Sequence, residues 1–313
     1  MRSKHGSFPA PPRSGAEVEF EVDDERGWKK VEIDPMPRPK LGADLCELDE
    51  FHASRSARRA DAGRTYRFTH LALPLVMKDM YYSSSDPGPG DRVPEFDLPV
   101  VGGGRFRSAD LASTGTTLLI FGSSTCPVTD NAAPGLTQLH RRFGDRVRFV
   151  MVNVREAHPG EAFPQPATLE EKTMHADRLR KLHGFDFDVA VDDTDGTLHR
   201  ALGSKPNSAY ILGGDGTILF RAHWANDTAA LESALTSIVA GKPPRRTQSG
   251  GLVLPMLRML PNIAPALDRA GRGAWDDMWL VAPPLAAIAY ILKLFGVRSK
   301  RHGTGADSRH RFF

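Results

Sequence analysis

The chain has 313 residues, with 41 Lys or Arg against 38 Asp or Glu, and its hydrophobic fraction of 40% is ordinary for a globular protein. The bases concentrate toward both ends, so the pI of about 8.9 describes the tails and predicts no nucleic-acid site. Two cysteines exclude a disulfide framework, and the lack of a CxxC or paired Cys/His spacing argues against a metal site.

Residues 1–89 are predicted to form a partly ordered N-terminal extension. No apolar stretch of signal-peptide length follows Met1, which together with the cysteine count predicts a cytoplasmic, reducing location. The alternation at 18–22 predicts an edge strand, and apolar residues at 41–56 and 71–80 have helical spacing. The Ser, Pro and Gly residues of 83–90 predict a linker.

In residues 90–242, apolar runs of strand type alternate with helical patterns, which is typical of an α/β domain with helices on both faces of its sheet. Strands at 116–121 and 147–154 flank a helix at 131–143 and predict one right-handed crossover. The other expected elements are helices at 169–183, 197–202 and 229–240, a strand at 188–191, and a hairpin of strands at 209–212 and 217–220.

Residues 243–313 are predicted to be a C-terminal extension with an apolar helix at 278–296. Its uncharged part is shorter than the roughly 20 residues that cross a bilayer as a helix. Trp275 and Trp279 suit a headgroup region, and bases follow the helix. Two interpretations stay open, a tilted or interfacial membrane anchor and a helix packed on the protein, and the latter is weakened by Pro283 and Pro284.

Cys126 is the candidate nucleophile. It follows a predicted buried strand and precedes Pro127 and a helix, so we expect it at the carboxyl edge of the sheet beside a helix N-terminus. Backbone amides and the helix dipole favour a thiolate there, which predicts a thiol pKa lowered from about 8.5 toward neutrality. Ser123, Ser124 and Thr125 are expected to support the sulfur with their hydroxyls. An inert structural cysteine is the alternative.

A dithiol enzyme would carry its second cysteine at position 129, where this chain has Thr129. Regeneration is therefore expected to need an external thiol reductant or a thioredoxin-like partner protein, and no cofactor is expected. Cys46 lies in an acidic run that disfavours its thiolate. The sequence leaves open whether Cys46 is a resolving cysteine or a bystander.

A second polar cluster follows the predicted strand at 147–154. Carboxyl ends of neighbouring parallel strands share one edge, so we expect Glu156 and His158 beside Cys126. His158 is the candidate proton donor or imidazolium partner of the thiolate, and Glu156 would orient it or titrate itself. A surface loop whose charges face water is the alternative.

Two motifs carry a resemblance to a known family. The run PEFDLP at 94–99 resembles the opening of redoxin and peroxiredoxin domains. The run FGSSTCP at 121–127 resembles the active-site loop of the iodothyronine deiodinases, with cysteine in place of selenocysteine, and EAHP at 156–159 followed by LEE at 169–171 is also deiodinase-like. The resemblance implies a thioredoxin-like fold with a mixed, mostly parallel sheet.

In the deiodinases the first motif supplies the nucleophile and the second its glutamate and histidine, so the resemblance implies these roles for Cys126, Glu156 and His158. The chain also departs from the family. The hormone-binding histidine and arginine of the deiodinases fall near Gln165 and Asn207 here. The resemblance to thioredoxin-like folds further implies a cis-proline close to Pro206.

The leading hypothesis is a thiol-dependent oxidoreductase resembling the deiodinases, which performs reductive dehalogenation or a related reduction of a small molecule. The alternative is a one-cysteine peroxiredoxin-type peroxidase, although the Thr that usually stands three residues before its cysteine is Ser123 here. A non-catalytic thioredoxin-like interaction protein is the third hypothesis. The sequence leaves a homodimer open.

Overall fold

The computed structural model describes residues 18–23, 27–32, 66–251 and 253–297. The chain divides into two compact units, Met1–Ser54 and Arg55–Phe313. In the first unit, β1 (Val18–Asp23) pairs antiparallel with β2 (Gly27–Glu32), which confirms the expected strand. The helix predicted at 41–56 and Cys46 lie outside the described residues.

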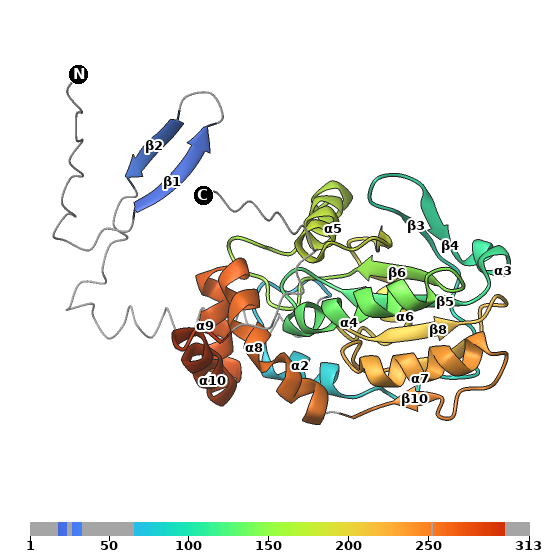
Figure 1. Ribbon diagram of the computed structural model, residues 1–313. Coiled ribbons are helices and arrows are strands. Elements are labelled where there is room, and N and C mark those ends of the chain that lie inside the picture. The colour runs from blue at the N-terminus through green and yellow to red at the C-terminus, as the bar shows by residue number, and fades with distance from the viewer. Residues whose placement is uncertain (1–17, 24–26, 33–65, 252, 298–313) are drawn as a thin grey trace, which may run out of the picture. The chain divides into compact units, whose positions relative to one another are not determined.

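The second unit is built on a six-stranded mixed sheet in the order β10-β9-β8-β5-β6-β7 (Figure 1). The central strand β5 is buried along its whole length and pairs in parallel with β6 and antiparallel with β8. The strands are β5 (Thr117–Gly122), β6 (Arg148–Asn153), β7 (Asp188–Val191), β8 (Ala209–Leu212), β9 (Ile218–Ala222) and β10 (Gln248–Ser249).

Alternate residues of β5 face two separate cores, as the pleat requires. Leu118 and Ile120 pack under the helices α4 (Pro127–Phe143), α5 (Leu169–His183) and α7 (Thr228–Val239). Leu119 and Phe121 face the other core. That side is covered by α3 (Leu111–Thr114), α6 (Thr197–Ala201) and the hairpin of β3 (Asp97–Pro99) with β4 (Arg105–Arg107).

This architecture confirms the predicted α/β, thioredoxin-like fold with helices on both faces. The bounds of α5, β7 and β8 are those expected from the sequence. Helix α4 begins at Pro127, ahead of the predicted start at 131, because proline is well suited to the first helical position, where no N–H partner is needed. The expected cis-proline is wrong, since no peptide bond within the described residues is cis.

Three helices follow the sheet and pack on one another around Leu267, Met278 and Ala286. They are α8 (Val253–Ala270), α9 (Arg272–Val281) and α10 (Pro283–Leu294). The single helix predicted at 278–296 is therefore wrong. The chain leaves helical geometry at Ala282, where the proline that follows disfavours the α conformation, and Pro283 then starts a new helix.

Helix α2 (Leu73–Met80) confirms the helical spacing seen near residues 71–80. Its buried residue Leu75 packs with Phe68 and Leu71, and Val281 of α9 packs against this group. Helix α2 thus lies against α9. Within the described residues, no helix combines the length and the apolar character that a bilayer crossing requires.

Candidate active site

Cys126 occupies the N-cap of α4, four residues after the end of β5. Its own backbone is extended, and Pro127 begins the helix. Because β5 lies inside the sheet and α4 packs on it, the turn that carries Cys126 is fixed at one end by the strand and at the other by the helix. The predicted place of Cys126, at a sheet edge and a helix N-terminus, is confirmed.

The Cys126 side chain is sealed in apolar packing, with only 2% of its surface exposed. It forms a cluster with Val128 and Trp224, against which Met80, Ala157 and Met259 also pack. Met80 comes from α2 and Met259 from α8, so a segment that precedes the sheet in the sequence and one that follows it both cover the thiol. A substrate can reach the sulfur only after some of these side chains move.

This burial reverses the predicted effect on the thiol. Desolvation raises the pKa of Cys126 to about 11, although hydrogen bonds from Thr129 and from the Val128 backbone lower it. The favourable helix N-terminus was expected correctly, but removal of the sulfur from water outweighs it, because a charged group in an apolar site loses its hydration. In the closed structure Cys126 is a thiol at neutral pH.

Thr129 lies directly behind the sulfur, one helical turn along α4. Its hydroxyl oxygen accepts hydrogen bonds from the Ser123 N–H at 3.4 Å and from Nδ2 of Asn207 at 3.0 Å. Asn207 also donates to the Phe121 carbonyl and accepts from the Ala225 N–H. Thr129 and Asn207 therefore position the Cys126 loop.

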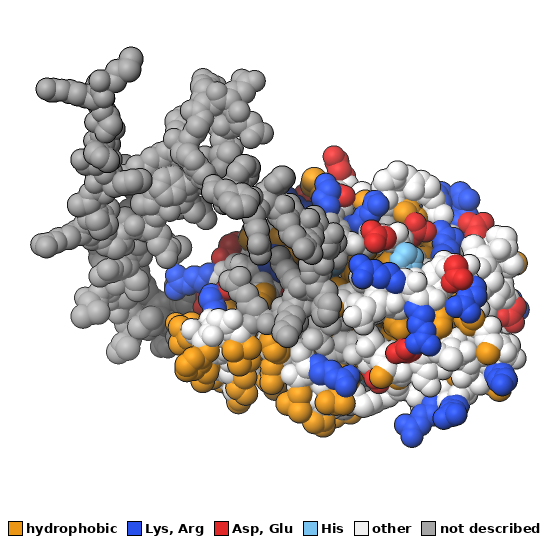
Figure 2. Space-filling view, viewed as in Figure 1, with side chains coloured by type: hydrophobic (Ala, Val, Ile, Leu, Met, Phe, Trp, Pro, Cys, Tyr) orange, Lys and Arg blue, Asp and Glu red, His pale blue; other side chains and the backbone are white. Residues whose placement is uncertain are grey.

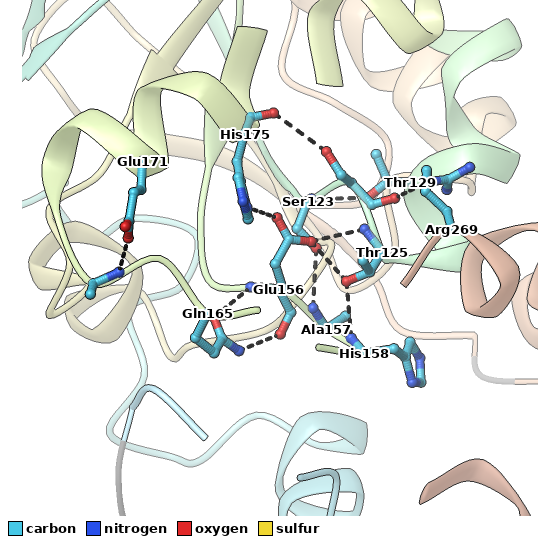
Figure 3. A network of polar contacts seen from close by, with 12 residues as sticks. Ser123, Thr125, Thr129, Glu156, Ala157, His158, Gln165, Glu171, His175 and Arg269 are labelled. Atoms are coloured by element: carbon cyan, nitrogen blue, oxygen red, sulfur yellow. Dashed lines mark hydrogen bonds and ion pairs between the residues drawn. The ribbon is translucent and has the colours of Figure 1, made fainter. Parts of the chain in front are cut away.

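The loop of Glu156 and His158 lies across the Cys126 loop, as the sequence predicted (Figure 3). The Ala157 N–H donates to Oγ of Ser123 at 3.2 Å, and the His158 N–H donates to Oγ1 of Thr125 at 3.1 Å. Hydroxyls expected to face the sulfur thus hold the neighbouring loop instead. They fix the distance between the two predicted motifs.

Glu156 is fully buried and forms the centre of this network. Its Oε2 accepts from the Thr125 N–H at 2.9 Å and from the Thr125 hydroxyl at 2.7 Å, and its Oε1 lies 3.0 Å from Nδ1 of His175 (Figure 3). Gln165 holds the Glu156 backbone at both its N–H and its carbonyl. Glu156 therefore contacts Thr125 and His175, and the expected orientation of His158 by its carboxylate is wrong.

The imidazole of His158 is turned away from Glu156 (Figure 3). Its Nδ1 is buried and has no hydrogen-bond partner among the described residues. Burial lowers the pKa of His158 to about 4, so the ring is neutral at physiological pH. A neutral imidazole with an available nitrogen can accept a proton, and a protonated thiol needs such an acceptor before it can react as a thiolate.

Helix α8 is tied to the cysteine loop by Arg269. Its guanidinium donates to the Ser124 carbonyl at 2.7 Å and makes two bonds to the Asp130 carboxylate in the first turn of α4. Paired bonds of this kind fix both distance and orientation. The C-terminal extension is therefore part of the site's structure.

The sequence did not predict His175, Arg269, Trp224 or Met259 as parts of this site. His175 carried a usable signal, since it lies within the helix that follows the second motif and on the face that turns inward. The others come from segments that join the site only through tertiary packing. A large cavity of about 750 Å³, lined by Arg92, Arg107 and Asp215 among others, shares no residue with the site.

Replacement of Glu156 by alanine is expected to lower the free energy of unfolding by about 3 kcal/mol, because it leaves the Thr125 donors and His175 buried without their acceptor. Urea denaturation measures this loss. The exposed Glu170 on α5 supplies the matched control, and Glu170→Ala should change stability by less than about 0.5 kcal/mol. Equal effects of the two substitutions would contradict the proposed network.

The fold and the site define a thioredoxin-like domain with one cysteine at the N-terminus of its central helix. Comparison with protein families agrees: residues 89–221 match the model of the AhpC/TSA family. The domain is therefore similar in sequence to the AhpC/TSA family over these residues, in agreement with its thioredoxin-like fold. The match does not single out the deiodinases, and a search of curated proteins gave no match.

Two solved structures illustrate the similarity. An uncharacterized conserved protein from Geobacillus kaustophilus shares 20% identity, with 54% of this chain and 90% of that chain covered and a TM-score of 0.43. The peroxidoxin BcpB from Mycobacterium tuberculosis shares 18% identity, with 49% of this chain and 97% of that chain covered and a TM-score of 0.38.

Proposed function

We propose that the chain is a thiol-dependent oxidoreductase in which Cys126 reduces an electrophilic small molecule, with reductive dehalogenation as the specific reaction. The observation that carries the proposal is the hydrogen bonding of the Glu156–His158 loop across the Cys126 loop. The family match over residues 89–221 supports the thiol chemistry. The deiodinase-like motifs support the specific reaction.

The reaction begins after the side chains over Cys126 move and water reaches the sulfur, because in the closed site the pKa values of about 11 for the thiol and about 4 for His158 oppose proton transfer between them. In the opened site the thiol proton passes to His158. The thiolate attacks the halogen of the substrate, so an S–halogen bond forms while the carbon–halogen bond breaks, and the carbon takes the proton from the imidazolium. An external thiol then displaces the halide and forms a mixed disulfide with Cys126. A second thiol restores Cys126 and leaves as the oxidised disulfide.

The surroundings of the sulfur support an apolar substrate. Trp224, Met80 and Met259 provide polarizable apolar contacts of the kind that aromatic rings and heavy halogens favour. Two polar atoms of the site, Nε1 of Trp224 and Nδ1 of His158, are buried without a partner among the described residues. Unpaired buried groups are costly, so they support a site that completes its hydrogen bonds with a ligand.

A one-cysteine peroxidase is the second candidate, and the AhpC/TSA match favours it. In that reaction the Cys126 thiolate attacks a peroxide oxygen, the O–O bond breaks, and a sulfenic acid and an alcohol or water form. Thiols then reduce the sulfenic acid. One observation counts against this candidate. The residue at position 123, where such peroxidases usually carry Thr, is a serine whose hydroxyl accepts from the Ala157 N–H, and the hydroxyl that contacts the sulfur is that of Thr129.

The purified chain should be assayed with dithiothreitol for iodide release from iodinated phenols and, separately, for consumption of hydrogen peroxide. Iodide release above the protein-free rate is the result we expect. Rapid peroxide turnover without iodide release would contradict dehalogenation and identify the chain as a peroxidase. Absence of both activities would leave a non-catalytic protein and contradict the proposal.

His158→Ala is expected to slow the reaction by about 10²-fold, because the thiol then lacks its proton acceptor and the product carbon its donor. Its melting temperature should stay near that of the wild type, since the His158 bond to Thr125 uses only the backbone N–H. His140→Ala, near the C-terminal end of α4, is a histidine control whose ring packs against Phe149 and Phe187 away from the cysteine loop. An unchanged rate in His158→Ala would remove His158 from the mechanism.

A further inference from the structure

Helix α10 has the reverse of the usual arrangement of apolar side chains. Its buried residues are the small Ala286 and Ala289, whereas Ile288, Ile291 and Leu294 point outward. Leu294 is 68% exposed, and the next residue, Phe295, is 80% exposed. A helix whose outer face contacts only water places its large apolar residues inward, so this exposed apolar stripe indicates contact with another apolar surface.

The exposed stripe continues over the neighbouring helices. Figure 2 shows hydrophobic side chains gathered where Figure 1 places α8, α9 and α10. We call this surface the apolar face, and it consists of Val253, Leu254, Leu257, Trp279, Leu280, Ile288, Tyr290, Ile291, Leu294 and Phe295. Single exposed apolar residues are normal on a protein, but a set drawn from three helices that pack on one another marks an interaction surface.

The sequence that follows this face indicates its partner. Lys293 of α10 is paired with Asp268 of α8 at 2.6 Å, so the surplus of positive charge comes from the sequence after α10, where Arg298, Lys300 and Arg301 precede any acid. Trp279 and Tyr290 are exposed on the face, and such amphipathic rings favour the headgroup level of a bilayer. A second copy of the chain would carry the same basic sequence, whereas anionic lipids would neutralise it.

We propose that the apolar face docks on the surface of an anionic lipid bilayer, with α8, α9 and α10 lying in the interface. Apolar side chains enter the boundary of the acyl chains, and the bases contact the headgroups. This proposal is independent of the chemistry at Cys126. It has a structural connection with that site, because α8 exposes Leu257 on the apolar face while its Met259 packs against the thiol.

Cosedimentation of the full chain with vesicles tests the proposal. We expect binding to vesicles of phosphatidylcholine with phosphatidylglycerol, weaker binding to phosphatidylcholine alone, and partial release by salt. The double variant Ile291→Glu, Leu294→Glu should bind at least about tenfold more weakly. Both side chains are exposed, so circular dichroism should show an unchanged fold.

Met174→Glu is the matched control, because Met174 is an exposed apolar residue of α5 outside the apolar face. This variant should bind vesicles as the wild type does. Failure of the wild type to bind anionic vesicles would overturn the proposal, as would equal binding by the Ile291, Leu294 variant. A concentration-dependent dimer that the same double variant disrupts, without vesicle binding, would assign the face to a second copy and also overturn it.

Discussion

Cys126→Ser is expected to lower thiol-dependent turnover by at least about 10³-fold, because a serine hydroxyl stays protonated and cannot form the sulfur–halogen or sulfenic intermediate. Serine is close in size to cysteine, and Thr129 can still donate to its oxygen. The variant should therefore fold. The rate of iodide release or peroxide consumption with saturating dithiothreitol measures the loss.

Cys46→Ser supplies the matched control for this experiment. With an external dithiol present, a bystander and a resolving cysteine at position 46 both predict nearly full activity, since dithiothreitol replaces the second thiol. Retention of activity in Cys126→Ser together with its loss in Cys46→Ser would place the chemistry on the other cysteine and refute the site described here.

The alkylation rate of Cys126 in the folded protein is expected to rise about tenfold for each pH unit between pH 7 and 10, because only the thiolate reacts and its pKa is about 11. Iodoacetamide and the Cys46→Ser variant isolate this single thiol. An ordinary exposed thiol has a pKa of about 8.5, so its rate levels off above about pH 9. The same protein unfolded in urea provides that reference.

The raised pKa also has a defined effect on stability. A thiol that stays protonated in the folded state stabilises the fold at any pH below its unfolded pKa, near 8.5. This contribution is lost as the pH rises from there through about 11, the folded value. A folded-state alkylation rate that levels off near pH 8 would show that the cover over Cys126 is open in solution and contradict its burial.

Much of the sheet domain could be predicted because its signals are local. The strand at β5 is a run of apolar residues between turn signals, and the hairpin of β8 and β9 has glycines at its turn. Two consecutive parallel strands with a crossover helix then place the residues after each strand at one edge. The proximity of Cys126 to the Glu156 loop followed from topology alone.

The remainder depended on tertiary packing, which the sequence pattern does not encode locally. The cover of Cys126 comes from Met80 and Met259, which lie far from it along the chain. The pKa of the thiol was predicted with the wrong sign, because the favourable helix N-terminus is visible in sequence and desolvation is not. Likewise, the Glu156 partner is His175, whose place on the inward face of α5 is visible in the sequence but whose partner is not.

The central claim is that the Cys126 sulfur forms a bond with substrate-derived or reductant-derived atoms during turnover. Peptide mass spectrometry after a single turnover, with dimedone or glutathione to trap the oxidised sulfur, measures this directly. We expect an adduct on Cys126 that is absent when substrate is omitted. Conversion of the substrate with Cys126 unmodified throughout would contradict it.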